Sequence, residues 1–492
     1  MNAREEAPER TPSDPAMPIR PTLGLWDAVS IIVGIVVGTA IFKSPTMVFQ
    51  NVTGPWAAMG VWLLGGLLSL NGALCYSELA TTYPRSGGDY HYLSQAFGRW
   101  MGFLFGWAQL AVILTASIAA MAYAFADYGV RLWRYEPHET SATLWLAVGA
   151  IVALSLANLL GVLFGKAVQN LLSAVKILGL VGVVLAGVGH AVWYAVTPEP
   201  LTVRAPMQGP GLGLALVFVL YAYGGWNDTA FVAAEVRRQK RNLPLALFLG
   251  IGLITVVYLL VNMAYMLVLG FDGARETYTP AADVMKMALS PWGEAAGRLG
   301  GSAISALVMV SALGAINGLI LTGSRIYASL GTDHRVFAGL ARWNQRRGAP
   351  VMALVVQGAI AVLLVLAVGT RHARYAIDGA LAIAGRDGLP WEEYGGGFEM
   401  LVSATAPVFW TFFFLTGVSL FVFRWIDPHR PRPFRTPLFP LPPIVFCATC
   451  CYMFYSSLTY ARGLSIIGLL PLAVGVPLYF VSERRREGAS TR

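Results

Sequence analysis

The chain has 492 residues, of which 56% are hydrophobic and only 12% are charged, and its formal net charge at pH 7 is +9. A soluble protein usually carries about 25% charged residues, so this chain has too few to cover several soluble domains. The composition excludes a disordered protein, a disulfide-rich scaffold and a cytosolic enzyme. It indicates an all-α membrane protein that crosses the bilayer many times.

Residues 1–20 are polar and rich in proline, which predicts a disordered cytoplasmic tail. Three apolar runs that follow are interrupted by charge: 26–50 by Asp27 and Lys43, 167–189 by Lys176, and 211–235 by Asp228. Nine runs lack Asp, Glu, Lys and Arg and are long enough to cross a hydrocarbon core of about 30 Å: 54–77, 100–126, 142–165, 243–271, 299–324, 350–370, 401–423, 438–460 and 463–482. The sequence therefore predicts twelve transmembrane helices in a domain covering 21–482, with a short cytoplasmic tail at 483–492.

Basic residues predict the orientation. If the spans alternate, most of the 35 Lys and Arg fall on the same side as the N-terminus, with the densest cluster at 237–241. The positive-inside rule then places both termini in the cytoplasm, in the inner or plasma membrane of the cell. The same bias accounts for the positive net charge without a nucleic-acid partner.

Residues typical of enzymes and metal sites form no recognisable pattern. The cysteines, Cys75, Cys447, Cys450 and Cys451, all fall in apolar spans, where small packing residues are common. The six histidines lie at span ends or in loops, and no zinc, nucleotide or nucleophile motif is present. We expect no enzyme activity, no cofactor and no metal, and no outer-loop cysteine that would join a partner subunit by a disulfide.

Glycines near the middle of the first and sixth spans suggest two broken helices. They are Gly34 and Gly38 in one span, and Gly224 and Gly225 in the other. Gly34-x-x-x-Gly38 alone is also typical of a helix-packing face. Transporters built from inverted repeats, however, often interrupt corresponding spans where the substrate binds, and the spacing of five spans fits that arrangement.

An opened helix exposes N–H groups at the start of one half and C=O groups at the end of the other. A carboxylate suits the first set and an ammonium suits the second. Because an α-amino acid carries both groups on one carbon, the paired breaks predict a zwitterionic substrate.

Several segments around these breaks resemble the L-type amino-acid transporter family of the amino acid–polyamine–organocation superfamily. The segments are 31–45, 72–79 with 86–90, 220–227 with Glu235 and 241–244, 316–318, 324–325 and 432–435. The resemblance implies a LeuT-type fold with inverted repeats at about 23–195 and 211–424 and two extra helices within 438–482. It also implies sodium-independent exchange or uptake of amino acids by alternating access.

Site residues follow from the resemblance position by position. The N–H groups of Thr39, Ala40 and Ile41 would bind the substrate carboxylate. The carbonyls of Val36, Tyr221 and Gly224 would bind the ammonium, and Tyr221 would also be an aromatic gate. The remaining substrate-binding candidates are Ala222, Tyr223, Asn227 and Asp228, and Lys176 would replace the sodium ion of sodium-coupled relatives.

The sequence departs from the family at four places. Ala40 stands where the family has a glycine, and its methyl group narrows the carboxylate site. Residues 371–398 form an outer insertion longer than the corresponding link in the family. The second outer segment lacks the cysteine that forms a disulfide with the heavy chain in animal relatives. Asp228 replaces an uncharged residue; it would cap the outgoing half-helix, select polar or cationic substrates, or couple transport to protons.

Acidic residues at the inner ends of the spans suggest a gate. Glu78, Asp89 and Glu235 are expected to pair with basic residues such as Arg85 and Arg237. Two alternatives to an amino-acid transporter stay open at this point. One is a membrane sensor that binds amino acids without translocating them, and the other is a transporter of polyamines or cationic amino acids.

Overall fold

Ten long apolar helices dominate the described part of this computed structural model. The structure describes residues 24–83, 88–132, 141–160, 166–194, 211–228, 236–342, 344, 350–383 and 385–490. The side chains of 166–175, 228 and 484–490 are not described. The ten helices are long and apolar enough to cross a bilayer. The ten are α3 (Pro55–Thr82), α5 (Arg99–Ala108) continued through the π-turn η2 (Gln109–Ile113) into α6 (Leu114–Leu132), α7 (Ser141–Leu159), α8 (Lys166–Trp193), α11 (Gln239–Glu276), α13 (Glu294–Asp333), α14 (Val351–Gly369), α16 (Gly397–Ile426), α17 (Leu441–Tyr460) and α18 (Arg462–Ser490). The described residues therefore form an all-helical, multi-pass membrane protein.

Two shorter apolar helices occupy the places of the first and sixth expected spans. They are α1 (Leu25–Val36) and α9 (Leu212–Ala222). The 12 residues of α1 extend about 18 Å at 1.5 Å per residue, which is too short to cross the hydrocarbon core. After α1 the chain continues as η1 (Thr39–Phe42) and α2 (Ser44–Gln50), and after α9 as η3 (Trp226–Asp228). Both segments are thus interrupted helices.

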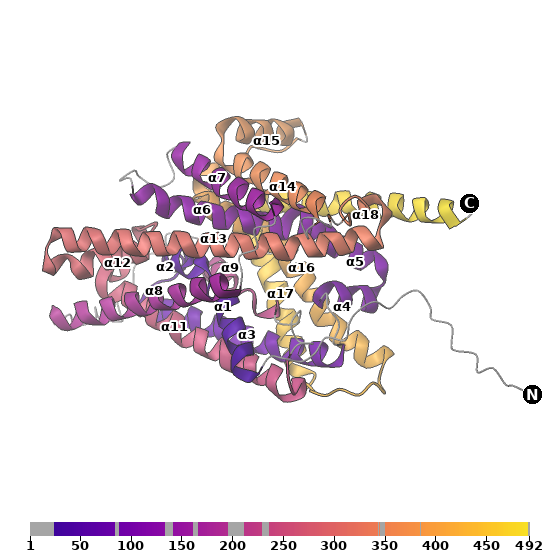
Figure 1. Ribbon diagram of the computed structural model, residues 1–492, viewed down its shortest axis with the longest axis horizontal. Helices are drawn as coiled ribbons and strands as arrows, with labels where there is room; N and C mark the ends of the chain where they lie inside the picture. Colours follow the sequence, from indigo (N-terminus) through magenta and orange to yellow (C-terminus); the bar gives the residue numbers. More distant parts are fainter. Residues whose placement is uncertain are drawn as a thin grey trace, which may run out of the picture.

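The helices lie side by side along the long axis of the molecule (Figure 1). Helix α12 (Pro280–Leu289) lies at one end, and α4 (Gly88–Phe97) lies towards the other. We call these the α12 end and the α4 end. Helix α1 packs against α11, α2 packs against α9, and α9 packs against α3 and α17. The interrupted segments therefore lie inside the bundle, between the two ends.

Large side chains face outwards and small ones lie between the helices. Leu185 of α8 and Leu363 of α14 are 65% and 64% exposed, as expected of surfaces that contact lipid. A Cβ atom on Gly66 of α3 would lie 2.3 Å from Oγ1 of Thr255 on α11, and one on Gly187 of α8 would lie 2.5 Å from Cβ of Ala264. These glycines let the backbones approach closely, which is how membrane helices gain packing energy.

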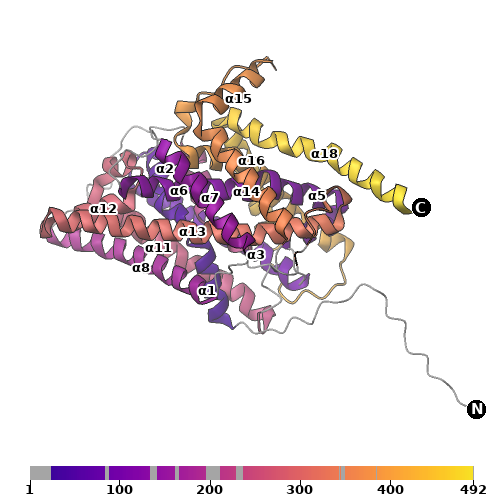
Figure 2. The same ribbon diagram turned by 45° about the horizontal axis from the view of Figure 1, so that its top comes forward.

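The segment 371–398 forms a helical projection. It contains α15 (Arg371–Ile383) and η7 (Trp391–Tyr394), and α15 stands out from the bundle in Figure 2. The Asp378 carboxylate accepts hydrogen bonds from the Leu389 N–H and from Trp391 Nε1, both at 2.9 Å. At the end of the chain, α18 continues to Ser490, where a tail was expected from residue 483. The expected N-terminal tail lies outside the described residues.

Candidate functional site

The first break begins where α1 ends at Val36. Val37 leaves the helical region, with φ −70° and ψ 81°, and Gly38 is extended, with φ −105° and ψ −162°. The Gly38 N–H donates to the Val36 carbonyl at 2.7 Å. Gly34 lies within α1, so the helix continues past the first expected glycine and ends before the second.

The second break begins where α9 ends at Ala222. Gly225 has a φ of +101°, a conformation that favours glycine. A Cβ atom on Gly225 would lie 2.9 Å from Cγ2 of Ile35. The glycine therefore allows the second break to contact the last turn of α1, and the two breaks lie against each other.

Tyr258 of α11 connects the two breaks. Its hydroxyl lies 3.1 Å from the Val36 carbonyl and 3.0 Å from the Ala222 carbonyl. One hydroxyl hydrogen is shared between two acceptors, and each carbonyl oxygen has two lone pairs. The Val36 carbonyl also accepts from the Gly38 N–H, so Tyr258 is its second hydrogen-bond partner. The sequence analysis missed Tyr258, because a tyrosine within a long apolar span has no distinguishing pattern.

The residues of η1 are buried. Thr39 and Ile41 have no exposed surface, and Ala40 is 6% exposed. The Thr39 hydroxyl is buried without a hydrogen-bond partner among the described residues. A cavity of about 20 Å³ lies beside Gly224, Trp226 and Ser69. It holds about one water molecule, so this space is too small for an amino acid.

Aromatic rings close the breaks towards the α12 end. The ring of Tyr221, at the end of α9, lies edge-on to that of Phe398 in α16, with centroids 5.8 Å apart. Tyr223 points elsewhere: its hydroxyl donates to the Trp62 carbonyl of α3 at 3.1 Å. Asp228 ends η3, and its side chain lies outside the described part.

Asp89, in the first turn of α4, approaches the second break from the other side. Its carboxylate accepts from the Thr416 hydroxyl of α16 at 3.3 Å, and it also interacts with Tyr76 and Asn227. Burial raises the pKa of Asp89 to about 6, although these hydrogen bonds favour the ionised form. In the described part of the chain its partners are polar, not basic as expected. Arg85 and Glu235 lie outside that part.

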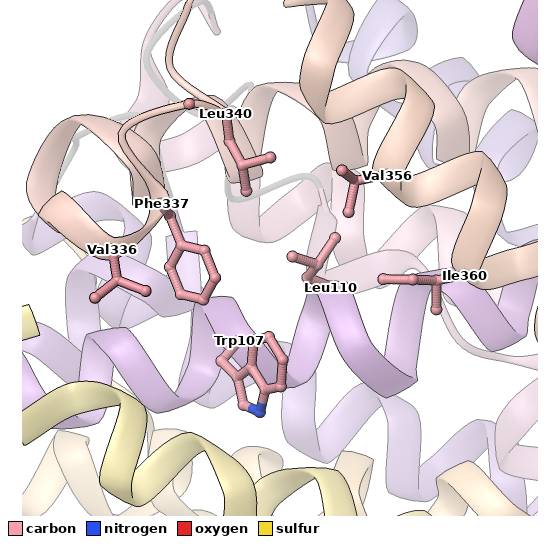
Figure 3. Close-up of a pocket in the computed structure, with 8 residues that line it drawn as sticks. Trp107, Leu110, Val336, Phe337, Leu340, Val356 and Ile360 are labelled. Carbon is pink, nitrogen blue, oxygen red and sulfur yellow. The ribbon is translucent and has the colours of Figure 1, made fainter. Parts of the chain in front are cut away.

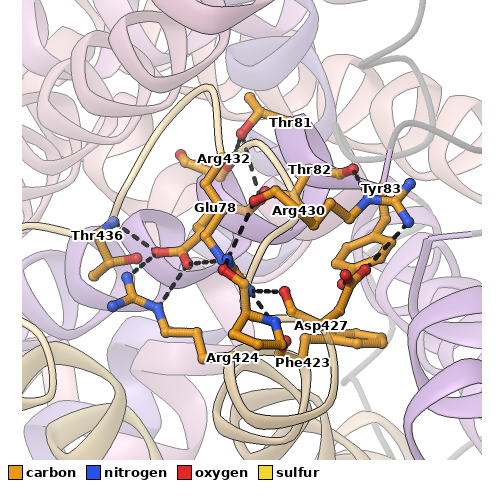
Figure 4. Close-up of polar contacts among 12 residues, drawn as sticks. Glu78, Thr81, Thr82, Tyr83, Phe423, Arg424, Asp427, Arg430, Arg432 and Thr436 are labelled. Carbon is orange, nitrogen blue, oxygen red and sulfur yellow. Dashed lines mark hydrogen bonds and ion pairs between the residues drawn. The ribbon is translucent and has the colours of Figure 1, made fainter.

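Glu78 of α3 is the centre of a polar network at the α4 end (Figure 4). Its two carboxylate oxygens accept from Arg424 Nε and Nη2 at 2.8 and 2.6 Å, and one also accepts from the Thr436 N–H at 2.7 Å. Arg432 lies 3.5 Å from the same carboxylate. Among the described residues its partners come from α16 and the segment after it; Arg85, one of the expected partners, lies outside the described residues. The network joins α3 to α16 and closes this end.

Lys43, which the sequence analysis noted only as an interruption, is held at the first break. It lies between η1 and α2, and its ammonium is 2.7 Å from Oδ2 of Asp127 in α6 and 3.7 Å from Oε1 of Glu399 in α16. The three side chains are 1%, 1% and 3% exposed. We call them the Lys43 cluster. The two acidic residues lie more than 250 positions apart in the sequence, so no motif connects them.

Lys176 is also buried, at 4% exposure, on α8. Helix α8 packs against α13, and α13 packs against η1. Lys176 forms no ion pair with the described residues. Its assigned role as a replacement for sodium stays a prediction.

A second cavity lies apart from the breaks, between η2, η6 (Arg335–Phe337) and α14 (Figure 3). It measures about 360 Å³, and its lining includes Leu110, Phe337, Leu340 and Ile360. The Nε1 atom of Trp107, which also lines it, already donates to the Pro471 carbonyl at 2.6 Å. This apolar cavity offers little to a zwitterion, so the two breaks are the better candidate site.

Comparison with known proteins identifies the family of the chain. Residues 23–481 match the amino acid permease family. The chain is 29% identical over 488 residues to the rabbit (Oryctolagus cuniculus) large neutral amino acids transporter small subunit 2, covering 97% of this chain and 83% of the relative. It is 29% identical over 425 residues to the human b(0,+)-type amino acid transporter 1, covering 85% and 78%. These matches confirm the resemblance drawn from the sequence, and the chain belongs to the amino acid permease family, with L-type amino-acid transporters among its relatives.

Proposed function

We propose that this protein is a secondary transporter that moves α-amino acids across the cell membrane by alternating access, without sodium. The observation that carries the proposal is the pair of helix breaks that face each other across Tyr258. Two interrupted helices that meet inside a bundle are the arrangement expected of a transporter site.

The breaks provide binding groups for both charges of a zwitterion. The N–H groups of Thr39, Ala40 and Ile41, at the start of η1, bind the carboxylate. The carbonyls of Val36, Tyr221 and Gly224 bind the ammonium. The Tyr258 hydroxyl supports this assignment, because it holds the Val36 and Ala222 carbonyls of the two breaks next to each other.

Two closures support alternating access. Glu78 and its arginines close the α4 end, and the Tyr221–Phe398 contact closes the breaks towards the α12 end. In our proposal α1 and α9 are halves of broken spans, which gives twelve spans in two inverted repeats and two extra helices. The α4 end is cytoplasmic, as the positive-inside rule requires, and the chain works without a disulfide-linked heavy chain.

Neutral amino acids are the substrates to test first. The relatives include a protein named for large neutral amino acids, and this match covers nearly the whole chain. Most of the described groups around the two breaks are backbone atoms, aromatic rings and small side chains, and the Asp89 carboxylate that approaches the second break already has polar partners. The charged Lys43 cluster lies beyond Phe398 and is already ion-paired. This lining favours a neutral side chain over a polyamine or cationic substrate.

Counterflow in proteoliposomes tests the proposal. Vesicles loaded with an unlabelled neutral amino acid should accumulate external labelled leucine, and vesicles without protein should not. N-acetyl-leucine and the decarboxylated amine should compete poorly, because each lacks one charged group. Saturable leucine binding without flux would identify a sensor, and preferential polyamine flux would support the other alternative.

Asp228 offers a separate test of selectivity. We propose that it either caps the outgoing half-helix, selects polar or cationic substrates, or couples transport to protons. Asp228→Asn keeps an oxygen suited to capping but removes the charge. If it caps, the substrate ranking stays the same. If it selects, polar and cationic substrates lose about 1–3 kcal/mol of binding relative to leucine. If it couples protons, the effect of a pH gradient disappears instead.

A further inference from the structure

The cavity of about 360 Å³ between η2, η6 and α14 has an apolar interior (Figure 3). It is lined by aliphatic and aromatic side chains and by one glycine, Gly339. Among the lining side chains the one polar atom is Trp107 Nε1, which already donates to the Pro471 carbonyl. The volume lies in the usual range for cavities that bind small ligands, about 300–1,000 Å³. The group that enters it must therefore be apolar, such as a hydrocarbon chain.

One wall of the cavity continues into the lipid-facing surface of α14. Val356 and Ile360, which line the cavity, are half-buried. Their neighbours on the same helix, Met352, Val355 and Leu363, are 50%, 46% and 64% exposed. Large apolar side chains that are exposed together on a membrane-spanning helix mark a surface that contacts lipid. The hydrocarbon of the bilayer therefore adjoins the cavity.

The opposite wall, η6, lies at the α4 end of the bundle. The Tyr90 hydroxyl of α4 donates to the Asp333 carboxylate at 2.6 Å, and Arg99 of α5 donates to the Asp333 carbonyl at 3.1 Å. Asp333 ends α13, and η6 begins two residues later. In the orientation proposed above, this end faces the cytoplasm, where the membrane surface carries anionic lipids.

Two exposed arginines flank the lining residues of η6 and the turn after it. Arg335 directly precedes Val336, and Arg342 follows Leu340 by two residues. The nearest carboxylate along the chain, that of Asp333, is already hydrogen-bonded to α4. A guanidinium has five N–H donors and pairs well with phosphate, so it can bind a headgroup in addition to a partner in the protein. The apolar cavity and its cations together match a molecule with a hydrocarbon chain and an anionic head.

We propose that this cavity binds one anionic phospholipid of the cytoplasmic leaflet, with an acyl chain in the apolar interior and the phosphate at Arg335 and Arg342. The choice of leaflet rests on the proposed function, whereas the binding itself does not. Tyr327 of α13 packs beside the same cavity, and its hydroxyl donates to the Gln109 carbonyl of η2 at 3.0 Å. The bound chain therefore stabilises the packing of η2, α13 and α14.

Native mass spectrometry of delipidated protein in detergent tests the binding. The unaltered protein should bind one phosphatidylglycerol on the order of tenfold more tightly than phosphatidylcholine with the same chains, as expected of two basic residues beside an anionic headgroup. Glycerol 3-phosphate, which has the phosphate without a chain, should neither bind nor compete. Equal binding of the two lipids, or binding of glycerol 3-phosphate, would overturn the proposal. A dimer in place of the lipid complex would assign the cavity to a second copy of the chain.

A variant that occupies the cavity locates the lipid. Gly339→Phe adds a ring to the lining without a clash at Cβ, because a Cβ atom there would meet no atom within 4 Å. It should weaken phosphatidylglycerol binding on the order of tenfold and remove the rise in unfolding temperature that this lipid gives the unaltered protein. Gly149→Phe is the matched control, because Gly149 of α7 is exposed and equally open. Tight binding that persists in Gly339→Phe would place the lipid elsewhere.

A surface variant tests the headgroup site without altering the core. Arg335→Gln combined with Arg342→Gln should remove the preference for phosphatidylglycerol, with an unchanged gel-filtration profile. Lys240→Gln combined with Arg241→Gln should keep it; these residues are exposed at the same end, where the adjacent Gln239 bonds to α3. An unchanged preference in the first double variant would contradict the headgroup assignment. Tight lipid binding by a protein without counterflow would support this inference and contradict transport alone.

Discussion

Lys176 is a buried cation whose proposed role depends on its position. It lies on α8, which packs against α13, and α13 contacts η1 at the first break. A charge in a membrane span is costly, and such residues are functional by default. Removal of the ammonium should therefore affect the geometry of the break more than the overall packing.

Lys176→Ala should reduce leucine counterflow at least tenfold while the protein remains folded. In our proposal the fixed charge of Lys176 takes the place of a sodium ion and holds the break in its binding geometry. Initial counterflow rates and gel-filtration profiles measure the two effects. Lys286→Ala, which removes an exposed lysine of α12, is the control. Unchanged counterflow in Lys176→Ala would show that the ammonium has no functional role.

Asp89 predicts a pH dependence of stability. Its pKa is raised from 3.8 to about 6 by burial, so between these values the folded state binds more protons than the unfolded state. Stability should therefore fall as pH rises from about 4 to about 6, by on the order of 3 kcal/mol, and stay lower above that range.

Thermal unfolding at pH values from about 4 to 8 measures this decrease. Asp89→Asn should remove that part of the dependence, whereas Asp387→Asn, at an exposed position, should retain it. A decrease of equal size in Asp89→Asn would assign the effect to other groups.

At the scale of elements, the interrupted helices depend on close backbone contact. Helix α9 can end against α1 only because Gly225 adopts a positive φ and presents no Cβ atom to Ile35. Tyr258 then joins the carbonyls of both helix ends from α11. The geometry of the site is therefore set by three elements that are distant in the sequence.

Gly225→Ala should disturb this arrangement. The substitution places a Cβ atom 2.9 Å from Ile35 and imposes a left-handed conformation that costs about 1–2 kcal/mol. We expect leucine affinity to fall about tenfold, which is the ratio that corresponds to about 1.4 kcal/mol. Gly252→Ala is the control, because its Cβ atom would meet no atom within 4 Å. Equal affinities for Gly225→Ala and the unaltered protein would remove this glycine from the site.

At the scale of the whole molecule, contacts lie on both sides of the breaks and, in our proposal, close them. Glu78 joins α3 to α16 at the α4 end, and Phe398 of α16 covers Tyr221 in the opposite direction. Because α16 takes part in both contacts, we propose that a tilt of this helix relative to α3 and α9 opens one end while the other stays shut. That is the behaviour alternating access requires.

Leucine uptake by the protein should be independent of sodium. Replacement of external sodium by choline should leave leucine uptake unchanged, since a fixed lysine replaces the cation in our proposal. Initial uptake rates in proteoliposomes, with and without an inward sodium gradient, provide the measurement. A steep increase with the gradient would contradict the assignment of Lys176.

The sequence by itself determined the class of the molecule and the location of its breaks. Long uncharged runs leave only membrane-spanning helices as a solution, because unpaired backbone groups are too costly in lipid. Paired glycines in the first and sixth apolar runs indicated where these helices would open. Their exact ends differ: α1 passes through Gly34, since a glycine permits a break without requiring one.

Only the tertiary structure decided which side chains meet. Tyr258 between the two breaks, Arg424 on Glu78, and Lys43 with Asp127 and Glu399 all join helices that are far apart in the chain. Sequence periodicity reports which face of one helix is apolar, but it carries no information about the rotation and depth of its neighbours. The partners of a buried charge depend on both, because desolvation and pairing are set by the whole packed bundle.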